Sequence, residues 1–86
     1  MSKLQNLTNT LNEIVKDDKD RWRVHVDDHT KSFVIYRGDE DICGGYFDHN
    51  TKRIKGVEFM DKKYQKSNMI RIKVINLIKK TFPDYK

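Results

Sequence analysis

The stretch RWRVHVDDHTKSFVIY, residues 21–36, begins with side chains that are alternately polar and apolar. Its first apolar set is Trp22, Val24 and Val26, and the polar set between them is Arg21, Arg23 and His25. Successive side chains of a β-strand point to opposite faces, so a period of two predicts a strand with one apolar face. The pattern resumes at residues 32–36, and the polar residues in between predict a tight turn. The stretch therefore indicates an antiparallel hairpin.

The turn of this hairpin has a near copy further along the chain. VDDHTKSF at residues 26–33 and FDHNTKRI at residues 47–54 share an Asp, a His and a Thr-Lys pair. An Asp side chain bonds the backbone two residues on, Asn tolerates positive φ, and Thr suits the start of the returning strand. Turn chemistry therefore explains the repetition without a duplicated active site. The first hairpin also resembles the second hairpin of the immunoglobulin-binding domain of streptococcal protein G, whose turn is Asp-Asp-x-Thr-Lys; the likeness implies shared turn geometry and no shared function.

Two further strands follow the first hairpin. A turn at residues 38–41 leads into ICGGYFD, residues 42–48, and the second turn leads into RIKGVEFM, residues 53–60. Gly44, Gly45 and Gly56 are candidates for bulges or close backbone approaches. A bulge at Gly56 would place the apolar residues of the last strand on one face: Ile54, Val57 and Phe59.

Both ends of the chain have helical spacing. The N-terminal apolar positions are Leu4, Leu7, Leu11, Ile14 and Val15, with Ser2 as the N-cap. Residues 61–82 are ambiguous, because Ile70, Ile72 and Val74 alternate as in a strand while a longer apolar row has helical spacing. The length of this segment and the stop signal of Pro83 favour a helix.

The expected fold is a single α+β domain over residues 1–86. Its order is α-β-β-β-β-α, with one four-stranded antiparallel sheet, a meander of hairpins, packed against the N- and C-terminal helices. A chain of 86 residues is near the size at which one core is only just sufficient, so a homodimer is one expectation.

Several function classes are disfavoured by the residues present. Cys43 is the single cysteine, which excludes an internal disulfide and favours a cytoplasmic protein. No apolar run approaches the ~20 residues of a membrane span, and the N-terminus does not resemble a signal peptide. His25, His29 and His49 lack the spacing of a zinc site, Cys43 is typical of a small core residue, and CGGYF is not a phosphate loop. We therefore expect no catalytic residues, no metal and no cofactor.

Positive charge is concentrated near the C-terminus. Residues 61–86 carry eight Lys or Arg against two Asp, or +6, which leaves −1 for the first sixty residues of a total of +5. On a helix with 100° per residue, one ridge would contain Lys62, Lys66, Lys73 and Lys80. Such a ridge would extend about 27 Å and follow several phosphates. Within the predicted helix of residues 61–82 no Glu lies at an i−4 position to offset it, although a solvated helix face is the simpler interpretation.

A second basic cluster is predicted on the sheet. Arg21, Arg23 and His25 point away from the apolar face of the first strand, and strand pairing would bring Tyr36, Tyr46 or Lys55 beside them. Basic residues interleaved with aromatic ones form a stacking surface for single strands. The alternative is that Tyr46 and Tyr36 face the helices as part of the core.

Two functions follow from these patterns. The first is a small, basic, non-enzymatic nucleic-acid-binding accessory protein, with DNA or RNA as the partner. The second is a protein-interaction module, which regulates or inhibits a partner with an acidic surface, or dimerises through the first helix or a sheet edge. The salt dependence of binding separates them, because phosphate contacts release counterions.

Overall fold

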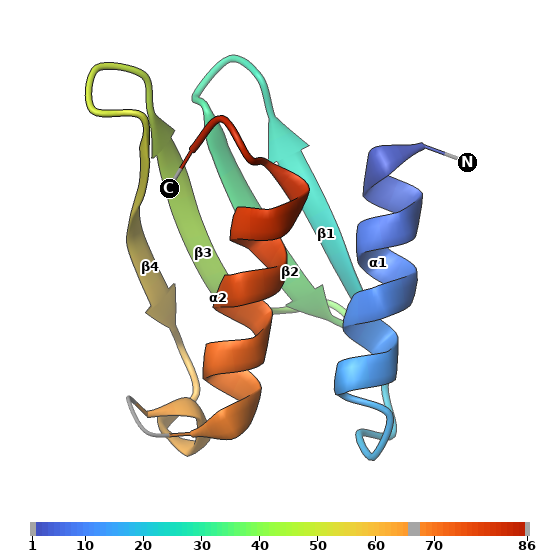
Figure 1. The fold of residues 1–86 in the computed structure, drawn as a ribbon. Helices are drawn as coiled ribbons and strands as arrows, with labels where there is room; N and C mark the ends of the chain where they lie inside the picture. Colours follow the sequence, from blue (N-terminus) through green and yellow to red (C-terminus); the bar gives the residue numbers. More distant parts are fainter. Residues whose placement is uncertain (1, 66–67, 86) are drawn as a thin grey trace.

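The structure is a computed structural model that describes residues 2–65 and 68–85. Its elements are α1 (Lys3–Ile14), β1 (Trp22–Asp27), β2 (Ser32–Arg37), β3 (Glu40–Asp48), β4 (Arg53–Phe59), the 3₁₀ turn η1 (Lys62–Tyr64) and α2 (Met69–Thr81). The strands form one antiparallel sheet in the order β1-β2-β3-β4, and both helices lie on the same face of it (Figure 1). The predicted α+β fold and its element order are confirmed.

The helix boundaries follow from capping side chains. Ser2 caps α1, since its Oγ accepts from the backbone N–H of Gln5 at 3.1 Å, as the sequence predicts. The predicted start of the last helix at residue 61 is wrong. Asp61 caps only the short turn η1, and Asn68 caps α2 by accepting from the backbone N–H groups of Ile70 and Arg71. An Asn side chain at this position satisfies donors that the first helical turn leaves unpaired.

Helical packing decides the ambiguous residues 69–75. Ile70 and Val74 pack against the core, together with Ile78, whereas Ile72 is 41% exposed. This spacing of four places the packed side chains on one stripe of a helix. The strand-like alternation of these residues is therefore incidental.

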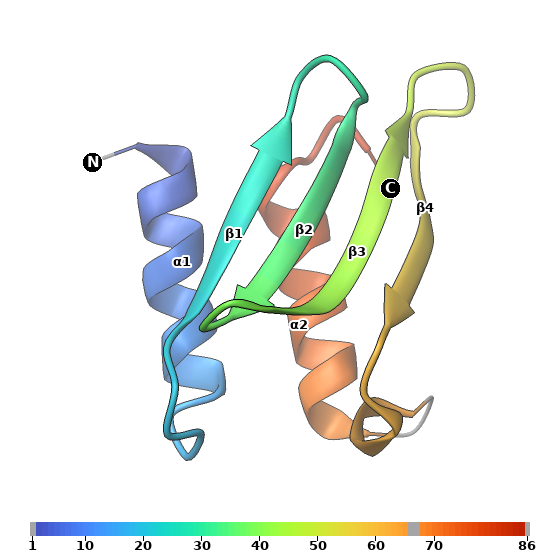
Figure 2. The same ribbon diagram turned by 180° about the vertical axis from the view of Figure 1, so that it is seen from behind.

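The two repeated turns have the same geometry. Asp27 accepts from the backbone N–H groups two and three residues on, at 2.8 and 3.4 Å, and Asp48 does the same at 2.9 and 3.3 Å. Each turn then has a lysine with positive φ, Lys31 at 54° and Lys52 at 56°. The repetition is thus a repeated turn, and it places both turns at the same end of the sheet (Figure 2).

Two bulges set the faces of β3 and β4. Ile35 pairs with Cys43 and Tyr36 with Asp41, so Ile42 is an extra residue; β3 also begins at Glu40, inside the predicted turn. In β3 one residue separates Gly44 from Tyr46, whereas in β4 two residues separate their partners, Glu58 and Lys55. One of these two residues is Gly56, whose φ is 64°. The predicted bulge at Gly56 is confirmed. Its effect is also as expected, because three side chains pack together on the core: Ile54, Val57 and Phe59.

The core fills the space between the helices and one face of the sheet. Its buried members are Leu7, Leu11, Val15, Trp22, Phe33, Ile35, Ile42, Cys43, Phe47, Tyr64, Val74 and Ile78. Trp22 packs edge-on against Tyr64, with ring centroids 5.6 Å apart, and its indole N–H donates to Asp18 at 3.0 Å. Most apolar side chains of the sheet point to this side, and the opposite face has polar and aromatic residues together with Val34.

The edge strands are β1 and β4. Asn12 of α1 pairs with the edge of β1: its Oδ1 accepts from the backbone N–H of Trp22 at 2.9 Å, and its Nδ2 donates to the carbonyl of Trp22 at 2.8 Å. The bulge at Gly56 bends β4, and bulges and charges discourage strand addition at an edge. Within residues 2–65 and 68–85, neither helix is long and apolar enough to cross a bilayer.

Candidate nucleic-acid interface

The face of the sheet opposite the helices presents both tyrosines of the predicted cluster. Tyr46 is 46% exposed and pairs across the strands with Lys55. Tyr36 pairs with Arg23, whose guanidinium carbon lies 4.5 Å from the centroid of the Tyr36 ring. The alternative that these tyrosines belong to the core is therefore wrong. The register of the hairpins places them on the open face, and their neighbours along the chain, Ile35 and Phe47, on the core face.

The four sheet residues of the predicted cluster fall into two groups. Arg23 lies four residues along the strands from the row that contains Tyr46 and Lys55, a separation of about 13 Å. Arg21 is exposed just before β1, still further from Tyr46, and its carbonyl accepts from Gly38. The structure thus brings Tyr46 and Lys55 together and leaves Arg21 and Arg23 at the other end of the sheet.

Tyr46 is held flat against the sheet. Its ring lies over Gly56, where an added Cβ would come within 2.7 Å of a ring carbon. Lys55 forms an ion pair with Asp48 at 3.2 Å, and the pKa of Asp48 is lowered by this hydrogen bond and by the backbone N–H groups that the turn directs at it. The glycine therefore gives a half-exposed aromatic ring a fixed position.

The open face alone is not basic. The register places four acids on it, Asp27, Asp41, Asp48 and Glu58, against three cations, Arg23, Arg53 and Lys55. The open face offers an aromatic platform, but a strand of phosphates needs more cations than this face supplies.

Such cations surround an open cleft beside the start of β4. This basic cleft, of about 490 Å³, is lined by Thr51, Lys52, Arg53, Ile54, Lys79 and Asp84. Lys52 and Arg53 come from the second repeated turn, and Lys79 comes from α2. Among the described residues, no carboxylate is within ion-pair distance of these three cations, since the four ion pairs are made by Arg37 and Lys55. Asp84 also lines the cleft, so the lining has a net charge of +2 at a site two residues from Lys55.

The C-terminal segment forms one wall of the basic cleft. The Tyr85 ring packs on Phe47, with centroids 5.1 Å apart, and the Tyr85 hydroxyl shares a 3.1 Å hydrogen bond with Nδ1 of His49. The ammonium group of Lys52 lies 5.9 Å from the same ring. These contacts hold the chain end beside the turn that carries the cations.

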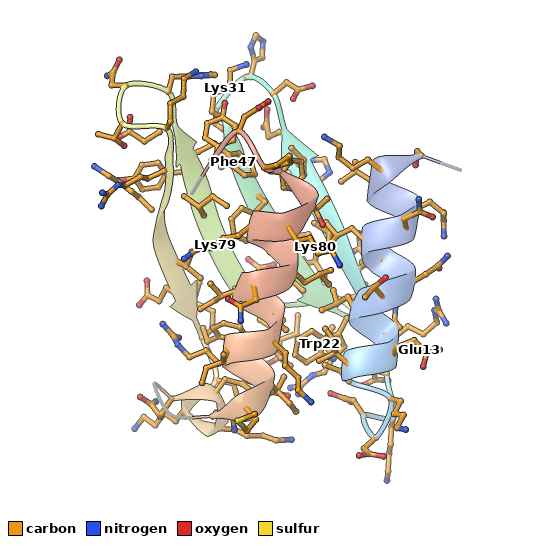
Figure 3. The ribbon with its side chains drawn as sticks, in the orientation of Figure 1. Glu13, Trp22, Lys31, Phe47, Lys79 and Lys80 are labelled. Carbon is orange, nitrogen blue, oxygen red and sulfur yellow. The ribbon has the colours of Figure 1, made fainter. Side chains whose placement is uncertain are left out.

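The predicted lysine ridge is not one continuous row. Lys62 lies in η1, Lys66 lies outside the described residues, and only Lys73 and Lys80 are on α2, about 10 Å apart. The expected 27 Å row is wrong because Lys62 belongs to the separate turn η1 and α2 begins only at Met69. Figure 3 shows Lys80 on the side of α2 that faces α1, and Lys79 on the side toward β3 and β4. A phosphate-binding role for these lysines stays a prediction.

Sequence reasoning missed the three cations of the basic cleft. Lys52 and Arg53 fall in the second predicted turn and the strand that follows it, and Lys79 is not one of the predicted ridge lysines. A usable signal was present, because a Thr-Lys-Arg run directly after a tight turn projects adjacent cations from one end of a sheet. Their meeting with Lys79 depends on the packing of α2.

The remaining candidate groups are the single cysteine and possible metal ligands. Cys43 is buried, and burial raises the pKa of its thiol to about 12, so the thiol is protonated at neutral pH. Across residues 2–65 and 68–85, no three His, Cys, Asp or Glu side chains gather as metal ligands.

Comparison of the chain with protein-family models, with curated proteins and with solved structures finds no match.

Proposed function

We propose that this protein binds single-stranded nucleic acid, DNA or RNA, with a base stacked on Tyr46 and the adjacent phosphates in the basic cleft. One observation carries the proposal: a half-exposed ring on an open sheet face lies close to a cleft with three unpaired cations. Arg53 of the cleft is two residues from Lys55, about 7 Å along the strand. A single strand can therefore contact the ring and the cleft together.

A single strand fits this arrangement better than a duplex. Stacking on a flat aromatic side chain requires an exposed base face, which a duplex hides within its own stack. The cations supply sequence-independent attraction through phosphates. A non-enzymatic accessory role follows, and the buried free thiol of Cys43 fits a reducing, cytoplasmic setting.

The test of the cleft is a fluorescence-anisotropy titration of labelled single- and double-stranded oligonucleotides at several salt concentrations. We expect micromolar binding of the single strand, with an affinity that falls as salt rises. Lys52→Gln with Lys79→Gln should weaken binding and reduce the log-log salt slope by about 1.4, at about 0.7 per lost phosphate contact. The charge-matched control is Lys16→Gln with Lys19→Gln, two exposed lysines outside the cleft. Equal effects of the two double variants would exclude the cleft.

The test of stacking is Tyr46→Ala. Stacking on an aromatic side chain contributes about 1–3 kcal/mol per base, so affinity should fall by at least about fivefold with an unchanged salt slope. Met60→Ala, at another exposed apolar side chain, is the control and should bind as the parent does. If Tyr46→Ala also binds as the parent does, no base stacks on this ring.

Protein interaction is the second candidate function. Strand addition at the edges is disfavoured by Asn12 and by the bulge at Gly56. A specific observation favours a different route, the groove between the two helices.

A further inference from the structure

A groove runs between α1 and α2 on the side away from the sheet. This interhelical groove, of about 390 Å³, is lined by Lys3, Asn6, Leu7, Thr10, Leu77, Lys80 and Thr81. Leu77 supplies partly exposed apolar surface, whereas Leu7 belongs to the buried core, and two lysines supply positive charge. The groove does not share a lining residue with the basic cleft.

The charges of the interhelical groove are all of one sign. No acidic side chain lines it, and within the described residues neither Lys3 nor Lys80 takes part in an ion pair. Lys3 lies over the Phe82 ring, with its ammonium group 5.2 Å from the centroid. Lys73 lies two helical turns before Lys80 on the same side of α2, about 10 Å away. An occupant with negative charge is therefore favoured.

The shape of the groove fits a helix. Lys3, Asn6 and Thr10 are spaced as one ridge of α1, and Leu77 and Lys80 are spaced as a ridge of α2. A third helix packs into such a groove through apolar side chains at i, i+3 or i+4, and i+7. Nucleic acid has no apolar side chains to cover the partly exposed Leu77, whereas an amphipathic helix does.

We infer that the interhelical groove is a docking site for an acidic amphipathic helix of a partner protein. The leucines of that helix cover Leu77. Its acids, spaced seven residues apart, face Lys80 and Lys73, and an acid on the other flank faces Lys3. This inference does not depend on nucleic-acid binding, since it uses other residues on another face of the molecule.

The test uses a labelled synthetic peptide of about three heptads, with Leu at the a and d positions and Glu at the flanking e and g positions. A scrambled peptide of the same composition controls for net charge. We expect the amphipathic peptide to bind at least about tenfold more tightly than the scrambled one. Thr10→Trp fills the groove from an exposed position and should abolish this preference, whereas Gln5→Trp on the outer face of α1 should retain it.

The charged rim is tested by Lys3→Gln with Lys80→Gln. Two exposed ion pairs are lost, so peptide affinity should fall about fivefold while oligonucleotide affinity is retained. Equal binding of the two peptides, or an unchanged preference in Thr10→Trp, would refute the docking site. A loss of oligonucleotide affinity in the lysine variant would also overturn it, because the groove would then belong to the nucleic-acid surface. A protein that binds the peptide and no oligonucleotide would keep this inference and reject the proposed function.

Discussion

Replacing Asn12 with Ala should destabilise the protein by removing the amide that pairs with the edge of β1. The side chain makes three hydrogen bonds: two to the backbone of Trp22, at 2.9 and 2.8 Å, and one to the carbonyl of Thr8, at 2.9 Å. The truncation leaves two backbone groups of a buried tryptophan without a protein partner. At about 1 kcal/mol net for each bond to Trp22, the free energy of unfolding should fall by about 2 kcal/mol.

Urea unfolding and a thermal melt measure this change. For a domain of 86 residues, about 2 kcal/mol corresponds to a Tm lower by about 8–16 °C, with an unchanged m-value. Asn9→Ala is the matched control, because Asn9 is exposed on the same helix and bonds only the side chain of Gln5. It makes the same gain in helix propensity, so the difference between the two variants isolates the contacts to Trp22. A difference below about 0.5 kcal/mol would refute the role of Asn12.

Three further predictions concern local features. Gly56→Ala should lower the free energy of unfolding by about 1–3 kcal/mol in urea, because the residue has positive φ and an added Cβ meets a ring carbon at 2.7 Å. Gly38→Asn is the control for this change. It should leave the free energy of unfolding nearly unchanged, because Gly38 also has positive φ but an added Cβ there has open space. Partial burial acts to raise the pKa of Asp18, but hydrogen bonds from Asp20 and Trp22 and the charge of Arg37 lower it from 3.8. The Asp18 carboxylate therefore stabilises the fold at pH values above 3.8, and this contribution is lost as the pH falls through its folded pKa. When unfolding is measured across the acid range, the free energy of unfolding should fall less in Asp18→Asn than in the parent. The buried Cys43 thiol should react with a thiol reagent at pH 8 only through opening of the fold, so its rate should rise with urea, and rapid reaction in native buffer would contradict its burial.

Local patterns predicted the sheet well because its signals are short in range. The alternation at residues 21–27 and the Asp-based turns depend on neighbours within a few positions, and both appear in the structure as expected. The bulge at Gly56 was predictable for the same reason. The start of α2 was not identified, although Asn68 is a good N-cap, because the helical spacing of the lysines continued through residues 61–68 and suggested one longer helix.

The proposed binding surfaces were less predictable, because they combine residues from distant parts of the chain. Arg53 and Lys79 meet across the basic cleft only once α2 packs beside β4. Lys79 and Lys80 are adjacent in sequence, yet they serve different surfaces, since consecutive helical positions differ by about 100°.

The amino-acid sequence by itself determined the order of elements, the hairpin turns and which side of each strand is apolar, since these depend on periodicity and local backbone chemistry. Tertiary structure alone decided that both helices cover one face of the sheet. That choice leaves Tyr46 exposed and Tyr36 partly exposed on the other face, and it gathers cations into a cleft and a groove. The physical reason is that the apolar stripes of two helices and one sheet face can be buried together in a single core, and the remaining side chains must then share the outer surfaces.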